Sequence, residues 1–276
     1  MRKNPIKQHG LRNVIIFLLS CGMFLAGFLL IWLSTFKIPS LETIEERKVS
    51  QSTKIYDNTG KILLYDVFQK AKRTIVPIEV ISPYIKEATI SIEDKDFYTH
   101  NGFKPTSFLR AVIANTVSGG FSQGGSTITQ QVVKNSILIG DKTITRKLKE
   151  IVLALKLDKT ISKDQILSIY LNENPYGGSI YGVEEATQAF FGKTSSEVTL
   201  AEAAYIAAIP QAPTHYSPYG KYRDDLEDRK NLVLAEMLED GKINKEEYQN
   251  AKEEKVEFVP KGNAGIKAPH FVMYIK

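Results

Sequence analysis

The stretch SPYIKEATISIEDKDFYTHNG, residues 82–102, joins a clear helix start to a dense group of ionisable side chains. Ser82 and Pro83 are typical of the N-cap and first position of a helix, which we expect to run toward Glu93. Three carboxylates and a histidine crowd the end of this helix: Glu93, Asp94, Asp96 and His100. They form either a solvated helix end or a catalytic carboxylate at the edge of a cleft, and the rest of the chain must decide between the two.

Residues 14–33, VIIFLLSCGMFLAGFLLIWL, form an uncharged run whose length matches the about 20 residues that a helix needs to cross a bilayer. Four basic residues precede the run: Arg2, Lys3, Lys7 and Arg12. Acidic residues follow it, so the positive-inside bias predicts a single-pass protein with a cytoplasmic N-terminus and the remainder outside. The run also holds Cys21, the only cysteine, which excludes disulfides and thiolate metal sites.

The remaining chain predicts a mainly α fold with a small β-hairpin near the membrane. Three capping-box pairs open apolar-periodic runs: Ser162 with Gln165, Thr199 with Glu202, and Asn244 with Glu247. Gly192 and Pro210 are expected to end two helices. KIY and ILLY flank the turn at residues 57–60, which indicates a hairpin over residues 54–65.

The net charge of +5 and pI of 9.0 do not indicate nucleic-acid binding, because removing the four charges of the N-terminal tail leaves only +1. One local patch is nevertheless cationic, and its members are Lys134, Lys142, Arg146, Lys147, Lys149 and Lys156. A patch of this size on an otherwise balanced domain favours a small anionic ligand such as a phosphate or pyrophosphate.

Three further stretches are candidates for a site. GGSTITQQ, residues 124–131, is either a flexible loop before a capped surface helix or a glycine-led helix start that favours an anion. In the second case Gln130 and Lys134, one turn apart, can face one ligand. In the helix expected over residues 145–159, four apolar residues have core-facing spacing: Leu148, Ile151, Val152 and Leu155. Arg146 and Glu150 then lie on the opposite face, as a solvated ion pair or as the wall of a cleft. Residues 170–178, YLNENPYGG, read as a turn-rich loop between helices in which Glu173 is either a site residue or solvated.

In this order the motifs resemble the peptidoglycan glycosyltransferase domain, glycosyltransferase family 51, of class A penicillin-binding proteins and monofunctional transglycosylases. The first family motif is matched by Glu93, Asp94, Phe97, His100 and Gly102. The later motifs are matched by GGSTITQQ with Lys134, RKLKE at 146–150, ILSIYLNE at 166–173 and TLAEAAYIAAIPQAPTHYSP at 199–218. One departure is Lys104, which stands where the family commonly has an aspartate.

The resemblance implies a lysozyme-like helical domain that joins lipid II units by inverting glycosyl transfer, with release of polyprenyl pyrophosphate. It implies Glu93 as the general base and Glu150 as a second catalytic residue that orients cations. The implied substrate-binding residues are Asp94, His100, Ser126, Gln130, Gln131, Lys134, Lys142, Arg146, Lys149, Asn172 and Glu173. Asp94 and His100 are expected to position their segment. No cofactor is obligatory, and a divalent cation, Mg²⁺ or Mn²⁺, is left open, with Glu150 as a candidate ligand.

The expected partners are lipid II, the growing glycan chain, membrane lipid and other cell-wall synthesis proteins, at the bacterial cell membrane. The expected organisation is a cytoplasmic tail (1–13), a transmembrane anchor (14–33), a stalk (34–52), the glycosyltransferase domain (53–260) and the start of a linker (261–276). The apolar run at residues 271–275 favours a chain that continues into a further domain. Two alternatives stay open: a lytic transglycosylase that cleaves glycan strands, and an inactive membrane-anchored cell-wall scaffold.

Overall fold

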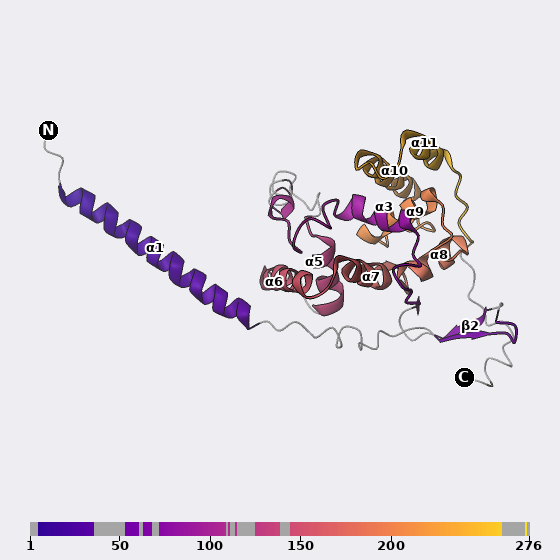
Figure 1. The fold of residues 1–276 in the computed structure, drawn as a ribbon, viewed down its shortest axis with the longest axis horizontal. Helices are drawn as coiled ribbons and strands as arrows, with labels where there is room; N and C mark the ends of the chain where they lie inside the picture. Colours follow the sequence, from indigo (N-terminus) through magenta and orange to yellow (C-terminus); the bar gives the residue numbers. More distant parts are fainter. Residues whose placement is uncertain are drawn as a thin grey trace.

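The computed structural model describes residues 5–35, 53–60, 63–67, 72–108, 110, 114, 125–138, 144–260 and 274. These residues are mainly helical, as the sequence predicts, with two small β elements (Figure 1). Lys142, most of the predicted stalk and nearly all of the predicted linker lie outside the described residues.

The first helix, α1 (Pro5–Ser34), contains the apolar run of the sequence. Large apolar side chains along it are exposed, among them Phe17 at 67% and Phe24 at 77%. When only the described residues are counted, no helix has both the length and the apolar character that crossing a membrane requires. The transmembrane helix therefore stays a prediction from the sequence.

The core is built around α9 (Leu200–Ala208), whose nine residues are all buried. Its sequence LAEAAYIAA is rich in alanine, and these small side chains let α3 (Pro83–Glu93) and α10 (Arg223–Glu239) pack directly against it and against each other. The fourth member of this group, α11 (Lys245–Glu253), packs on α10 and α9. Figure 1 shows these four helices as one side of the helical body.

A second group of helices contributes the segments that carry most of the predicted site residues. It consists of α5 (Ile128–Val132), a single π-helical turn η1 (Val133–Ile137), α6 (Ile144–Thr160), α7 (Lys163–Glu173) and α8 (Val183–Phe191). The short helix α5 packs against both α6 and α7 (Figure 1). A π-helical turn is often found at functional sites, and here it directly continues α5.

The predicted helix signals are confirmed. Ser82 is the N-cap residue of α3, and the three predicted capping boxes are present at the starts of α7, α9 and α11. Gly192 ends α8 with φ of +68°, and Pro210 lies in the 3₁₀ turn Ile209–Gln211 that follows α9.

The face of α6 that points to the core was predicted wrongly. Leu148 is 40% exposed, and the other three residues of the predicted face are only partly buried. The buried residues are instead Leu153, Ala154 and Leu157, and Glu150 is buried with them. Both sets have the i, i+3, i+4, i+7 spacing of one helix face, so periodicity could not choose between the two apolar stripes.

The β structure is partly as predicted. The hairpin of β1 (Thr53–Tyr56) and β2 (Leu63–Val67) is antiparallel, and the Gly60 N–H closes its turn on Asp57 O at 3.0 Å. The segment that follows α7 was predicted as a loop but contains two short strands, β4 (Pro175–Gly177) and β5 (Ile180–Tyr181). The strand β5 also pairs in parallel with β3 (Lys72–Arg73), so a partner distant in sequence completes this small sheet.

Candidate active site

Glu93, the last residue of α3, is held by groups from two other segments. The Gln131 amide Nε2 donates to Glu93 Oε2 at 2.6 Å. The guanidinium nitrogen Nη2 of Arg229, on α10, lies 3.8 Å from Glu93 Oε1. The Glu93 side chain is 13% exposed, so the carboxylate is largely buried yet still reaches solvent.

Two buried tyrosines lie close enough to Glu93 to feel its charge. Burial raises the pKa of both Tyr170 and Tyr176, and the negative charge of Glu93 adds to this effect. Both phenols therefore stay neutral at physiological pH. They give the carboxylate aromatic surroundings that reduce its hydration on that side.

Asp94 and His100 connect the end of α3 to the start of α5. Asp94 Oδ2 accepts from the backbone N–H of Ile128 at 3.0 Å and from His100 Nε2 at 2.9 Å. The other ring nitrogen, His100 Nδ1, accepts from the Gly102 N–H at 3.1 Å, so His100 Nε2 carries the hydrogen that it donates to Asp94. These contacts support the predicted positioning role of the two residues.

Gly102 allows this segment to approach α6 closely. Its φ is +79°, and a Cβ built there would lie 2.5 Å from the backbone oxygen of Ala154. The Gly102 carbonyl accepts from Thr127 Oγ1 at 2.7 Å. Only a residue without a side chain fits both the backbone angle and the space.

The start of α5 is fixed by a capping box between Thr127 and Gln130. Gln130 is fully buried and its Nε2 lies 3.4 Å from Glu150 Oε1, whereas Lys134 one turn later is exposed. The side-chain amide of Gln130 caps α5 and contacts Glu150. That Gln130 and Lys134 face one ligand stays a prediction.

Glu150 is buried, with 4% of its surface exposed. It therefore does not form the solvated surface ion pair with Arg146 that was one of the two alternatives. Lys147 forms an ion pair with Glu150 and donates to Ser126 Oγ at 2.7 Å. Lys147 thereby joins two predicted site residues, Glu150 and Ser126, although its sequence context predicted only membership of the cationic patch. Its signal was the spacing to Glu150, three residues on, which puts both side chains on one side of α6.

Glu173, the last residue of α7, accepts a hydrogen bond from Ser136 Oγ of η1. Glu173 also acts on Arg73: burial lowers the pKa of Arg73, and the charge of Glu173 opposes that decrease. Asn172 is 3% exposed and exchanges hydrogen bonds with the backbone of Val76, accepting at 2.9 Å and donating at 3.0 Å. Asn172 therefore clamps the segment before α3, and its role in ligand binding stays a prediction.

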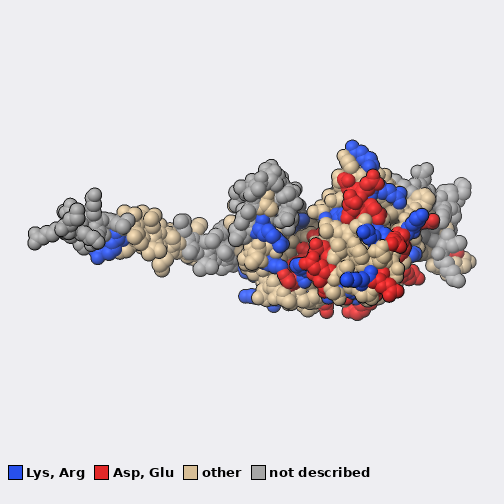
Figure 2. All heavy atoms as spheres, turned by 90° about the horizontal axis from the view of Figure 1, so that it is seen from above, with Lys and Arg blue, Asp and Glu red and all other residues tan. Residues whose placement is uncertain are grey.

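The predicted cations lie in more open positions. Lys134 is exposed, while Arg146 and Lys149 are partly exposed on the first turns of α6. Over the visible face of the helical body, basic and acidic side chains are interspersed (Figure 2). Lys104, the departure from the family pattern, forms an ion pair with Asp96. Within the described part of the chain, no three His, Cys, Asp or Glu side chains are grouped so that they could hold a metal ion, and the divalent cation stays a prediction.

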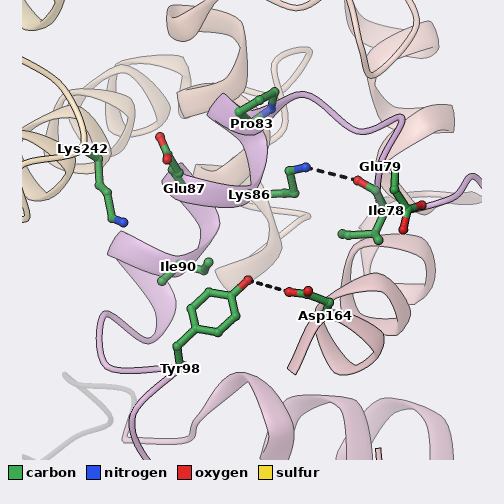
Figure 3. A pocket seen from close by; sticks show the side chains of 9 residues that line it. All are labelled: Ile78, Glu79, Pro83, Lys86, Glu87, Ile90, Tyr98, Asp164 and Lys242. Atoms are coloured by element: carbon green, nitrogen blue, oxygen red, sulfur yellow. Dashed lines mark hydrogen bonds between the residues drawn. The ribbon is translucent and has the colours of Figure 1, made fainter. Parts of the chain in front are cut away.

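A cavity of 320 Å³ lies beside α3 but contains none of the predicted site residues. Figure 3 shows Lys86, Glu87 and Ile90 of α3 along it, with Lys242 projecting from the α10–α11 connection. Tyr98 closes one side by donating to Asp164 at 2.9 Å, and burial together with this hydrogen bond raises the pKa of Tyr98 to about 12.

Comparison with known proteins gives one family match. A family model described as transglycosylase matches residues 60–238. Penicillin-binding protein 1A of Aquifex aeolicus (strain VF5) is 40% identical over 226 residues, which cover 82% of this chain and 31% of that protein. Penicillin-binding protein 1A/1B of Bacillus subtilis (strain 168) is 42% identical over 215 residues, covering 78% and 23%. The chain thus spans less than a third of the length of these relatives.

Among solved structures, a crystal structure of penicillin-binding protein 1A from Haemophilus influenzae aligns with a TM-score of 0.45 at 24% identity. That alignment covers 82% of this chain and 23% of the other.

Proposed function

The chain belongs to the transglycosylase family, and from this premise we propose that it polymerises lipid II into peptidoglycan glycan strands. The observation that carries the proposal is the setting of Glu93, a largely buried carboxylate at a helix end that faces solvent and has a fixed orientation. A carboxylate held in this way is suited to accept the proton of an attacking hydroxyl.

In the proposed reaction, the 4-hydroxyl of one sugar attacks the anomeric carbon of a lipid-pyrophosphate-linked chain. The hydroxyl proton passes to Glu93 as the oxygen forms the new C–O bond, with inversion at carbon. The bond from carbon to the pyrophosphate oxygen breaks, and polyprenyl pyrophosphate leaves with the electron pair. A hydroxyl is a weak nucleophile at neutral pH, so removal of its proton must accompany the attack.

The leaving pyrophosphate gains negative charge, which preorganised cations stabilise. We assign this role to Lys134, Arg146, Lys147 and Lys149 of the described residues, and to Lys142 from its place in the sequence. Glu150 orients Lys147, and Lys147 in turn holds Ser126. An optional divalent cation, Mg²⁺ or Mn²⁺, would add to the same stabilisation of the leaving group.

We propose that the apolar run of residues 14–33 anchors the chain in the bacterial cell membrane, with the N-terminus in the cytoplasm. The length and lack of charge of the run support this, as do the exposed apolar side chains of α1. An anchor also suits a substrate whose lipid tail lies in the bilayer. Neither alternative, a strand-cleaving enzyme or an inactive scaffold, is favoured by a contact among the described residues.

The test is incubation of the detergent-solubilised chain with purified lipid II, with isolated sacculi as a second substrate. Polymer from lipid II supports the proposal, whereas cleavage of sacculi without polymer would identify the lytic alternative, and no reaction would identify the scaffold. Glu93→Gln keeps the size and polarity of the side chain but cannot accept the proton. We expect it to lower turnover by about 100- to 10,000-fold without loss of fold. Near-normal turnover by a folded variant would remove Glu93 from the catalytic role.

A further inference from the structure

Both carboxylate oxygens of Glu93 face a partner, and the two partners come from different parts of the chain. Gln131, on α5, donates to Oε2 at 2.6 Å. Arg229, on α10, places Nη2 3.8 Å from Oε1. The resemblance to the family implies that Gln131 binds substrate, and it assigns no role to Arg229.

Arg229 is itself held firmly. Its Nε donates to the backbone oxygen of Ala208, the last residue of α9, at 2.9 Å. Its guanidinium lies over the ring of Tyr216, 5.4 Å from the centroid, and the side chain is only 11% exposed. The carbonyl at the end of α9 and the aromatic ring already fix the Arg229 side chain. Little further conformational entropy is therefore lost when its guanidinium interacts with the neighbouring carboxylate of Glu93.

We infer that Arg229 is a positioning residue that, together with Gln131, fixes Glu93 so that Oε1 is the oxygen that accepts the proton. The inference rests on the proposed function. Gln131 occupies Oε2 with a full hydrogen bond. The 3.8 Å separation at Oε1 exceeds the about 2.7–3.2 Å of an N–H···O hydrogen bond, so the guanidinium attracts Oε1 without consuming its lone pairs.

A purely structural role for Arg229 makes different predictions. If Arg229 only ties α10 to α9 through Ala208, its loss lowers stability, and an added cation cannot restore turnover. If Arg229 orients the base, its loss lowers kcat while KM for lipid II stays nearly constant, because the residue does not bind substrate. A misplaced catalytic group costs about 100-fold in rate.

The experiment measures kcat and KM on lipid II for the full chain in detergent and for Arg229→Ala, with thermal unfolding of each. We expect Arg229→Ala to lose about 100-fold in kcat with KM within about twofold. Guanidinium chloride, well below denaturing concentration, should restore part of this loss, and sodium chloride at equal ionic strength should not. The matched control is Arg223→Ala on the same helix, whose guanidinium lies over Phe258 at 5.1 Å and should leave kcat unchanged.

Wild-type protein that forms no polymer would overturn the proposed function and this inference with it. If the wild type polymerises, a folded Arg229→Ala variant with wild-type kcat, or with a loss that guanidinium does not restore, would overturn this inference alone. Should Arg229→Ala not fold, Arg229→Lys keeps the charge and most of the stem. It should retain at least about one-tenth of the wild-type kcat, and a loss as large as that of Glu93→Gln would contradict the inference.

Discussion

At the scale of single residues, the candidate site depends on side chains whose polar atoms both stabilise the fold and hold the proposed catalytic residues in place. Gln130 caps α5 and contacts Glu150, while Asp94 caps α5 from outside and accepts from His100. Such residues are buried, so their substitution disturbs both stability and activity. The informative substitutions are therefore those that separate the two effects.

Glu150→Gln separates the effect on stability from the effect on activity, because both Lys147 and Gln130 contact the same oxygen of Glu150, Oε1. An amide oxygen can still accept from both, so we expect a loss of only about 1 kcal/mol in the free energy of unfolding. Without its charge, however, the side chain no longer orients Lys147, and turnover on lipid II should fall by about 10- to 100-fold. Thermal unfolding and the polymerisation assay on one preparation test this. A large decrease in Tm with unchanged kcat would show that Glu150 is purely structural.

Gly102→Ala tests the close approach of the Glu93 segment to α6. The positive φ and the contact of the new Cβ with Ala154 O should together cost about 2 to 4 kcal/mol in the free energy of unfolding. Gly241→Ala is the matched control, because Gly241 has φ of +68° but open space around its Cβ position. It should cost only about 1 kcal/mol. Denaturant unfolding measures both, and equal losses would mean that the contact with α6 has no energetic weight.

At the scale of elements, α10 links the site to the core. Arg229 points from it toward Glu93, while the next residue, Lys230, is fully buried and forms an ion pair with Glu227 at 2.6 Å. Tyr205 of α9 donates to the same carboxylate. A buried cation needs such partners, so this cluster fixes how α10 lies on α9 and, through that, where Arg229 is placed.

The Glu227 cluster predicts a dependence of stability on pH. Burial opposes ionisation of Glu227, but hydrogen bonds from Lys230 and Tyr205 outweigh it, and the pKa of Glu227 lies below its ordinary value of 4.5. A lowered pKa in the folded state stabilises the protein above the unfolded pKa, and this contribution is lost as pH falls through the folded value. The difference in Tm between wild type and Glu227→Gln should therefore be constant from about pH 6 to 8 and shrink below about pH 4.

The size of this effect is limited, because the Glu227 side chain is 45% exposed and solvent screens its interactions. We expect at most about 1 kcal/mol at neutral pH. Asp228→Asn, an exposed acid on the same helix, is the control for the change in net charge. A difference that persists undiminished at pH 3 would contradict the assigned role of the Glu227 carboxylate.

At the scale of the whole molecule, charge and apolar surface are divided along the chain. The helical body has basic and acidic side chains interspersed on its visible face (Figure 2), and α1 has large exposed apolar side chains. Exposed apolar surface on this scale is unfavourable in water and calls for a lipid or protein environment.

Deletion of residues 1–35 tests the proposed anchor. The full chain should sediment with membranes and resist extraction by alkaline carbonate, because an apolar helix of this length inserts stably in a bilayer. The shortened chain should appear in the soluble fraction with an unchanged Tm, since the core residues of the described part of the chain all lie after residue 75. Carbonate extraction of the full chain without detergent would contradict the anchor.

The sequence by itself determined the features that depend on nearby residues. The capping boxes, the start of α3, the end of α8 and the β1–β2 hairpin were all predicted, because each depends on hydrogen bonds or backbone angles within a few residues. The order of motifs also led from the sequence to the family. The apolar face of α6 was not determined, because two stripes on that helix satisfied the same spacing.

Only the tertiary structure decided which distant segments meet. The pairing of β5 with β3, the burial of Glu150 and the approach of Arg229 to Glu93 join residues that no local pattern relates. The approach of Arg229 to Glu93, for example, follows from the packing of α3, α9 and α10, because burial of their apolar faces brings polar groups near their ends into reach of one another. Local hydrogen bonding thus set the elements, and burial of apolar surface set the geometry of the site.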